Sequence, residues 1–251
     1  MTGKTHMAIA GATVAVAMAA TGVRASGGVG GLLSLDLIEH EHGSAPYAIA
    51  GLLLFGMVAG LFPDLDAPDT ELQHLPRRAA DRLGRYVTAG MRGYSPLARL
   101  VREVMRMVAL PFTLVVGAVG AVLRASTGHR GFTHTLLGAL VFTGLVAGAT
   151  LLIARSVEWT VIIGVVWLLG YASHLAADAC TPSGIPLLGT SDRAAHDVRT
   201  HKATLYRSTP MFHLLPRGLR VRTGTTADTL LIRWAAWAIC AGAWAFMFMT
   251  R

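Results

Sequence analysis

Charge is scarce in this sequence of 251 residues, since Asp, Glu, Lys and Arg together make up only 14% of it. Soluble domains carry about 25% charged residues, so a fully water-exposed globular domain is excluded. The two cysteines, Cys180 and Cys240, lie far apart, which argues against a disulfide framework and favours buried thiols. Aromatic residues amount to 7%, and the basic segments lack the interleaved aromatics that stack nucleic-acid bases, so nucleic acid is not an expected ligand.

Apolar residues are abundant instead, at 53% of the sequence, and the mean hydropathy is +0.52. Gly144 and Gly148 have the GxxxG spacing that lets membrane helices approach closely. We predict an all-α fold, a polytopic membrane helical bundle that residues 1–251 form as a single domain. Nearly uncharged runs, each about long enough to cross a bilayer as a helix, occur at 7–23, 46–62, 107–123, 135–154, 157–177 and 229–249.

The distribution of positive charge predicts how the chain is oriented. Segments 63–107 and 178–228 are rich in Arg and Lys, so both are expected to be cytoplasmic loops, whereas 24–45 is weakly acidic and is expected outside. Both basic loops share one side only if 107–123, which contains the helix-kinking Pro111, does not cross fully. We therefore predict about five spans plus one interfacial or re-entrant segment, with the N-terminus in the cytoplasm.

Side chains of the types that bind metals stand where the apolar runs meet polar segments. With five spans, all of these borders lie on the cytoplasmic side, as a single site requires. A cleaved signal peptide over the first run is the disfavoured alternative, because cleavage would remove the first of these side chains. The borders carry His6, then Asp64 and Asp66, then His129 and His134, then His174 and Asp178.

Two of these borders also have a structural interpretation. The segment PDLDAPDT, with Asp64 and Asp66, is typical of a turn in which aspartates cap the backbone. In GHRGFTH, Thr133 is placed to cap the helix that follows it. Capping explains neither His129 nor His134, and a turn between them can bring the two imidazoles together.

His174 and Asp178 are four residues apart, so they share one face of a helix. Ionisable groups at the end of a span are costly unless they are paired or functional, which favours a ligand role. The whole ligand set suits zinc, with manganese or iron as alternatives, and its size indicates two or more ions. Asp66 is expected as a ligand or general base, and Arg130 is expected to bind a substrate phosphate or to face anionic lipid.

Five motifs together carry a resemblance to the YdjM-like family: MTGKTHMAIAG, GLFPDLDAPDT, HRGFTHTLLG, GYASHLAADACTPSGIPLLG and VRTGTTADTLL. The resemblance implies an inner-membrane-associated, metal-dependent hydrolase of a family described as LexA-binding, whose His and Asp motifs bind metal. More remotely, the family is similar to zinc phospholipase C and P1 nuclease, helical enzymes that act on phosphate esters. Asp228 stands where relatives are expected to have Glu, and the arginine-rich segment 72–106 is longer than the family implies.

The expected function is hydrolysis of a phosphoester of a lipid or lipid-linked substrate through metal-activated water. The expected location is the bacterial inner membrane, with the metal site on the cytoplasmic side and anionic head groups of membrane lipids as partners. The alternative is a non-catalytic, metal-stabilised adaptor whose basic loops recruit a cytoplasmic protein such as a DNA-binding repressor. A transporter is less favoured, because the ionisable residues gather at one membrane edge instead of mid-span.

Overall fold

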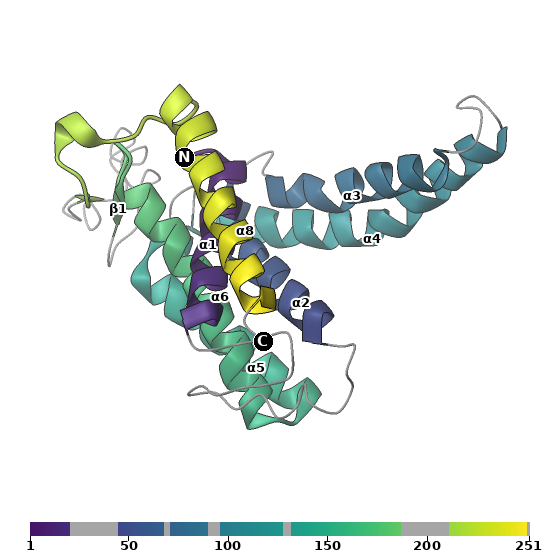
Figure 1. Ribbon diagram of the computed structural model, residues 1–251, viewed down its shortest axis with the longest axis horizontal. Coiled ribbons are helices and arrows are strands. Elements are labelled where there is room, and N and C mark those ends of the chain that lie inside the picture. The colour runs from purple at the N-terminus through teal and green to yellow at the C-terminus, as the bar shows by residue number, and fades with distance from the viewer. Residues whose placement is uncertain (21–44, 68–70, 90–95, 128–131, 187–210, 250–251) are drawn as a thin grey trace.

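The computed structural model describes residues 1–20, 45–67, 71–89, 96–127, 132–186 and 211–249. The helices among them form two parts (Figure 1). The first is a bundle of α1 (Gly3–Ala20), α2 (Ala45–Ala59), α5 (Leu136–Ala154), α6 (Val157–Ala179) and α8 (Arg233–Met249). The second is a hairpin of α3 (Glu71–Val87) and α4 (Pro96–Thr127), which projects from the side of the bundle.

Short elements connect these helices. They are the 3-10 turns η2 (Pro63–Asp66), η3 (Phe132–His134) and η4 (Arg217–Leu219), the π-helical turn η5 (Ala227–Ile232), and the strands β1 (Ile185–Pro186) and β2 (Met211–Phe212). The two strands pair antiparallel, with Ile185 opposite Phe212. Most of the described residues are helical and the remainder form short connections, so the predicted all-α membrane bundle is confirmed.

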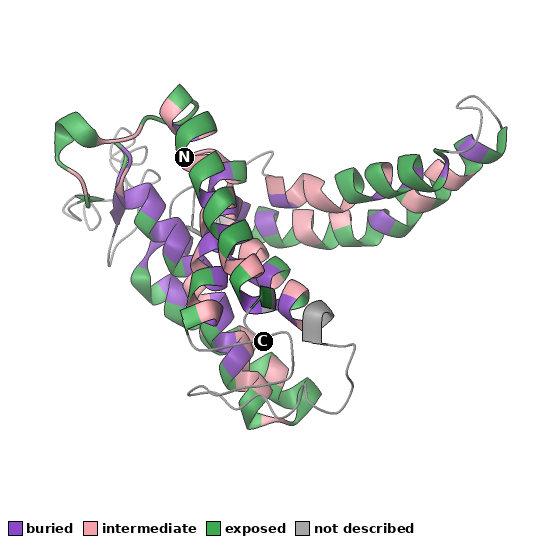
Figure 2. Cartoon of the chain, in the orientation of Figure 1, coloured by how far each residue is buried: buried purple, intermediate pink, exposed green. Residues whose placement is uncertain are grey.

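The centre of the bundle is formed by α1 and α6. Helix α1 packs against α2, α6 and α8, and α6 also packs against α2 and α5. Figure 2 shows buried residues concentrated where these helices meet, whereas the outer surfaces are largely exposed. The exposed side chains of α5 and α8 include Leu145, Ile153 and Trp234, as expected for helices that face lipid.

The close helix contacts do not occur at Gly144 and Gly148, the GxxxG pair from which the sequence predicted them. Gly144 and Gly148 have open space around the position of an added Cβ, so this motif does not bring described helices together. A Cβ at Gly170 of α6 would instead collide with the carbonyl oxygen of Gly56, and one at Gly60 would collide with Ala10 of α1. These glycines let α1, α2 and α6 approach closely beside the metal-ligand side chains.

The cap of α5 also differs from the sequence prediction by two residues. Thr135, not Thr133, is the N-cap, and its hydroxyl accepts a hydrogen bond from the backbone N–H of Gly138 at 2.9 Å. Thr133 lies in η3, outside the helix. Its hydroxyl is therefore available for a different contact, described below.

The ends of the bundle helices that carry the predicted ligands lie together. The turn η2, which follows α2, contacts η3, which precedes α5. The turn η5, which precedes α8, contacts α1. The N-terminal ends of α1, α5 and α8 therefore meet the C-terminal ends of α2 and α6. Residues 63–134 therefore leave and return at the same end of the bundle. This arrangement agrees with five bundle helices plus one segment that does not cross.

The α3–α4 hairpin lies across the direction of α6 and α8 in Figure 1. By length and composition, the described helices that can cross a membrane are α5, α6, Ala227–Met247 and also Pro96–Leu123 of α4. However, α3 packs along α4 and carries Arg77, Arg82 and Arg85 on its exposed surface. Inserting the hairpin would place these arginines in lipid, so an interfacial position is favoured.

Cysteine labelling tests this topology. On a background that lacks Cys180 and Cys240, we expect Arg99→Cys at the far part of the hairpin to be modified from the same side as Arg222→Cys. Glu158→Cys, at the opposite end of the bundle, should react only from the other side. Modification of Arg99→Cys from the Glu158 side would mean that the hairpin crosses the membrane.

Candidate metal centre

Three imidazoles and two carboxylates converge at the shared end of the bundle. They come from four elements that are distant in sequence: His6 from α1, Asp64 from η2, His134 from η3, and His174 and Asp178 from α6. The potential donor atoms form two sets, His6 with His174 and Asp178, and Asp64 with His134 and His174. The atoms of each set lie within 4.8 Å of one another, and His174 belongs to both.

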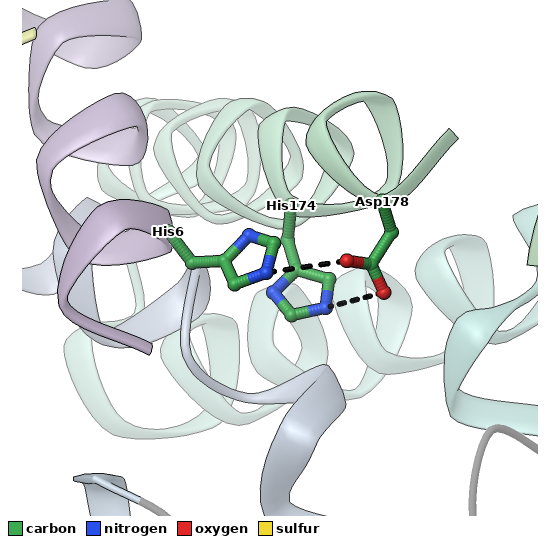
Figure 3. Close-up of side chains that lie close together, drawn as sticks. All are labelled: His6, His174 and Asp178. Atoms are coloured by element: carbon green, nitrogen blue, oxygen red, sulfur yellow. Dashed lines mark ion pairs between the residues drawn. The ribbon is translucent and has the colours of Figure 1, made fainter. Parts of the chain in front are cut away.

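The two carboxylate oxygens of Asp178 face different imidazoles of the cluster. Its Oδ1 lies 3.2 Å from Nε2 of His6. Its Oδ2 lies 3.7 Å from Nε2 of both His134 and His174. Figure 3 shows His6 reaching from α1 toward His174 and Asp178, which share one face of α6 as their spacing predicted.

Asp64, from η2, reaches the same two imidazoles as Asp178. Its Oδ1 lies 3.6 Å from Nε2 of both His134 and His174. The Asp64 side chain is 26% exposed, whereas the other four ligand-type side chains are at most 2% exposed. Asp64 is therefore the member of this cluster that is most accessible to solvent.

The orientation of His174 is set by the backbone. Its Nδ1 lies 2.8 Å from the carbonyl oxygen of Gly60, which can only accept, so Nδ1 carries the proton and donates. Nε2 is then left with its lone pair directed toward Asp64 and Asp178. Histidine ligands in metal sites are oriented in this way by a second hydrogen bond.

Asp66 lies behind His134, away from both donor sets. Its Oδ2 accepts a hydrogen bond from the hydroxyl of Thr133 at 2.7 Å and lies 3.7 Å from Nδ1 of His134. Tyr171 in turn donates its hydroxyl to the carbonyl oxygen of Thr133. Asp66 is fully buried and is placed to orient the imidazole of His134, a role different from the predicted ligand or general base.

The cluster stabilises positive charge. Burial disfavours the protonated form of His134, but contacts with Asp64 and Asp66 outweigh it and raise its pKa to about 9. Burial alone would raise the pKa of Asp64, yet electrostatic interactions with His174, His134 and His6 hold that pKa well below its usual range. The carboxylate of Asp64 therefore remains ionised and favours a cation beside it.

These residues fit a transition-metal ion. Buried polar atoms usually have a hydrogen-bond partner, but Nε2 of His174 and Nδ1 of His6 have none among the described residues. A cation between the imidazoles and carboxylates would satisfy the lone pair of His174. Nitrogen and oxygen donors together suit zinc, manganese or iron. The two donor sets share His174, so its Nε2 can serve only one of them at a time.

Not all of the predicted site residues lie in the described part of the chain. His129 and Arg130 fall in 128–131, outside the described residues. Asp228 is buried, and its Oδ2 accepts hydrogen bonds from the backbone N–H groups of Thr2 and Gly224 at 3.0 and 2.9 Å. It thereby ties the N-terminal end of α1 to the start of η5 and belongs to neither donor set.

Sequence reasoning missed the Gly60 carbonyl, the Thr133 hydroxyl and the Tyr171 hydroxyl. The Gly60 carbonyl accepts from His174, the Thr133 hydroxyl donates to Asp66 behind His134, and the Tyr171 hydroxyl donates to the carbonyl oxygen of Thr133. Every residue has a backbone carbonyl, so a sequence does not indicate which carbonyl will accept a hydrogen bond from a ligand side chain. Thr133 does stand directly before His134, and that adjacency is the one signal from which its role could have been suspected.

Comparison with known proteins gives one family. The sequence model of a family described as "YdjM inner membrane protein" matches residues 1–251. Curated proteins named "Inner membrane protein YdjM" from Escherichia coli (strain K12) and Shigella flexneri are each 44% identical over 63 residues, 24% of this chain. The match spans 30% of the length of those relatives. No solved structure matches the chain.

Proposed function

The chain belongs to the YdjM family of inner membrane proteins, and from this premise we propose that it is a membrane-bound metal-dependent hydrolase. Its substrate is a phosphoester of a lipid or of a lipid-linked molecule. Membership of the family, together with several apolar helices, makes the chain a multi-pass inner membrane protein. The reaction and the substrate are our proposal.

The observation that carries the proposal is the convergence of buried imidazoles and carboxylates from four elements. A cluster that served only to hold the helix ends together would gain little from three buried imidazoles facing two carboxylates. Removing such groups from water is costly unless a cation or a proton compensates them. His6, Asp64, His134, His174 and Asp178 would hold the metal.

The supporting residues have separate tasks in this proposal. A bound divalent ion would lower the pKa of a coordinated water and polarise a phosphoryl oxygen. Gly60 and Asp66 keep the two central imidazoles oriented, so the ligand geometry is formed before substrate arrives. Asp64, the partly exposed member, marks the side from which a phosphoester would approach.

The position of the centre favours a substrate borne by a lipid. The ligands lie at the ends of the bundle helices, where head groups gather if those helices span the membrane. The phosphate of a membrane lipid would thus reach Asp64 without leaving the bilayer surface. A water-soluble phosphoester would gain nothing from this placement.

A metal-dependence assay tests the proposal. The purified protein, treated with a chelator and then supplied with Zn²⁺ or Mn²⁺, should hydrolyse a chromogenic phosphodiester and phospholipids in mixed micelles. Asp178→Asn keeps the side-chain shape but removes the charge, and should lower the rate by at least about 100-fold. Arg85→Asn, an exposed substitution on α3, serves as the control and should retain the activity.

A non-catalytic adaptor is the second candidate, and the projecting α3–α4 hairpin favours it. The hairpin projects from the bundle (Figure 1) and carries exposed arginines such as Arg77 and Arg85, which a cytoplasmic protein could bind. Bound metal without hydrolysis of any phosphodiester in the same assay would favour the adaptor. Metal-dependent hydrolysis that Asp178→Asn removes would favour the enzyme.

A further inference from the structure

A cavity of about 490 Å³ lies between α1, α3 and the start of α8, outside the metal cluster. Its wall includes Gly3, Lys4 and Met7 of α1, which occupy one face of that helix. His6 points from an adjacent face, about 100° around the helix, into the metal cluster. The cavity and the metal centre therefore lie on different faces of the same turn of α1. No residue that lines the cavity belongs to either donor set.

Positive charge dominates the polar part of this cavity. Lys4, Arg78, Arg82 and Arg233 line it, together with a single carboxylate, Glu71. Glu71 pairs with Arg78. Within the described ranges, no carboxylate lies within ion-pair distance of Lys4, Arg82 or Arg233. Three cations from three separate helices thus face one cavity without a neutralising partner, which is the arrangement expected for an anion site.

The rest of the wall is apolar and aromatic. Trp234 and Trp237 of α8 and Leu75 of α3 line the cavity beside the cations. Trp234 is 63% exposed although it is large and apolar. Tryptophan is enriched at the depth where lipid head groups meet acyl chains, so these side chains place the cavity at a membrane interface.

We propose that this cavity binds the phosphate diester head group of an anionic membrane lipid. Lys4, Arg82 and Arg233 contact the phosphate, and the tryptophans and Leu75 contact the glycerol and the first part of the acyl chains. A free phosphate ion would use the cations but would leave this apolar wall exposed to water. The binding site goes beyond the proposed hydrolysis, because it does not require a metal ion.

Native mass spectrometry of the detergent-solubilised protein tests the proposal. The protein is mixed with equimolar phosphatidylglycerol and phosphatidylcholine, and the fraction that carries each lipid is measured. We expect a preference for phosphatidylglycerol that Arg82→Gln with Arg233→Gln reduces about fivefold for each charge removed. Arg85→Gln with Arg99→Gln removes the same charge from exposed positions outside the cavity and should keep the preference.

Two results would overturn the proposal. Equal loss of preference in the control pair would show a general charge effect, and displacement of phosphatidylglycerol by millimolar inorganic phosphate would show a site for free phosphate. The same measurement on Asp178→Asn separates this proposal from the proposed function. That variant should lose hydrolysis and keep the lipid preference, so each of the two can fail alone.

Discussion

Replacing His174 with alanine is expected to abolish stable metal binding, with affinity falling by more than about 100-fold. His174 belongs to both donor sets, so its removal takes a ligand from either position that an ion can occupy. It also removes the ring that stacks on His6, whose centroid lies 3.9 Å away. Metal content after dialysis against buffered Zn²⁺, measured by mass spectrometry, gives the affinity.

Two further variants show whether the loss is specific to the cluster. Asp66→Asn alters the residue behind His134 without removing a donor, and should weaken binding only about 10- to 100-fold. His213→Ala removes an imidazole that faces the Thr181 carbonyl and lies in neither donor set, and should leave metal content unchanged. If His174→Ala kept its metal while remaining helical by circular dichroism, the proposed centre would be wrong.

The general plan of the site followed from sequence because it depends on local patterns. An apolar run predicts a helix, and a polar residue at its border is carried to the membrane edge whatever the helix packs against. His174 and Asp178 share a face through helical spacing alone. Requiring the borders to share one side then predicted that 107–123 does not cross, and the hairpin returning to the same end agrees with this.

The details that depend on long-range packing were not predictable in the same way. Thr133 and Thr135 are equally good caps by residue type, and only the contact of Thr133 with Asp66, 67 positions away, separates their roles. The GxxxG spacing of Gly144 was likewise uninformative, because a glycine matters only where another backbone approaches it. That approach occurs at Gly170, which meets Gly56 and Gly60, so GxxxG spacing marks a close contact at that pair and not at Gly144 and Gly148.

The basic segment 63–107 shows a different limit. Its charge predicted a loop, yet it contains η2, α3 and the first part of α4. Arginine is a good helix former, and a helix with one charged face is as compatible with a water-exposed position as a loop is. The exposed arginines of this segment agree with a water-facing position, but its charge did not predict its backbone conformation.

Gly170→Ala is expected to destabilise the bundle by about 1–3 kcal/mol and to weaken metal binding at the same time. A Cβ at this position would collide with the carbonyl oxygen of Gly56 and would lie 2.9 Å from the Cβ of Ala59. Both obstacles belong to α2, one of them to its backbone, so no side-chain rotation relieves the collision. Helices α2 and α6 must separate.

That separation connects the packing of the helices to the metal centre. His174 lies one helical turn beyond Gly170, and its Nδ1–H donates to Gly60 at the C-terminal end of α2. Moving α6 away from α2 lengthens this hydrogen bond and releases the imidazole.

Gly144→Ala is the matched control, because an added Cβ there meets open space and alanine is the better helix former. The unfolding temperature in detergent and the zinc content should both fall for Gly170→Ala, and neither should fall for Gly144→Ala. If Gly170→Ala lowered the unfolding temperature but left zinc affinity unchanged, the helix contact would not support the metal centre.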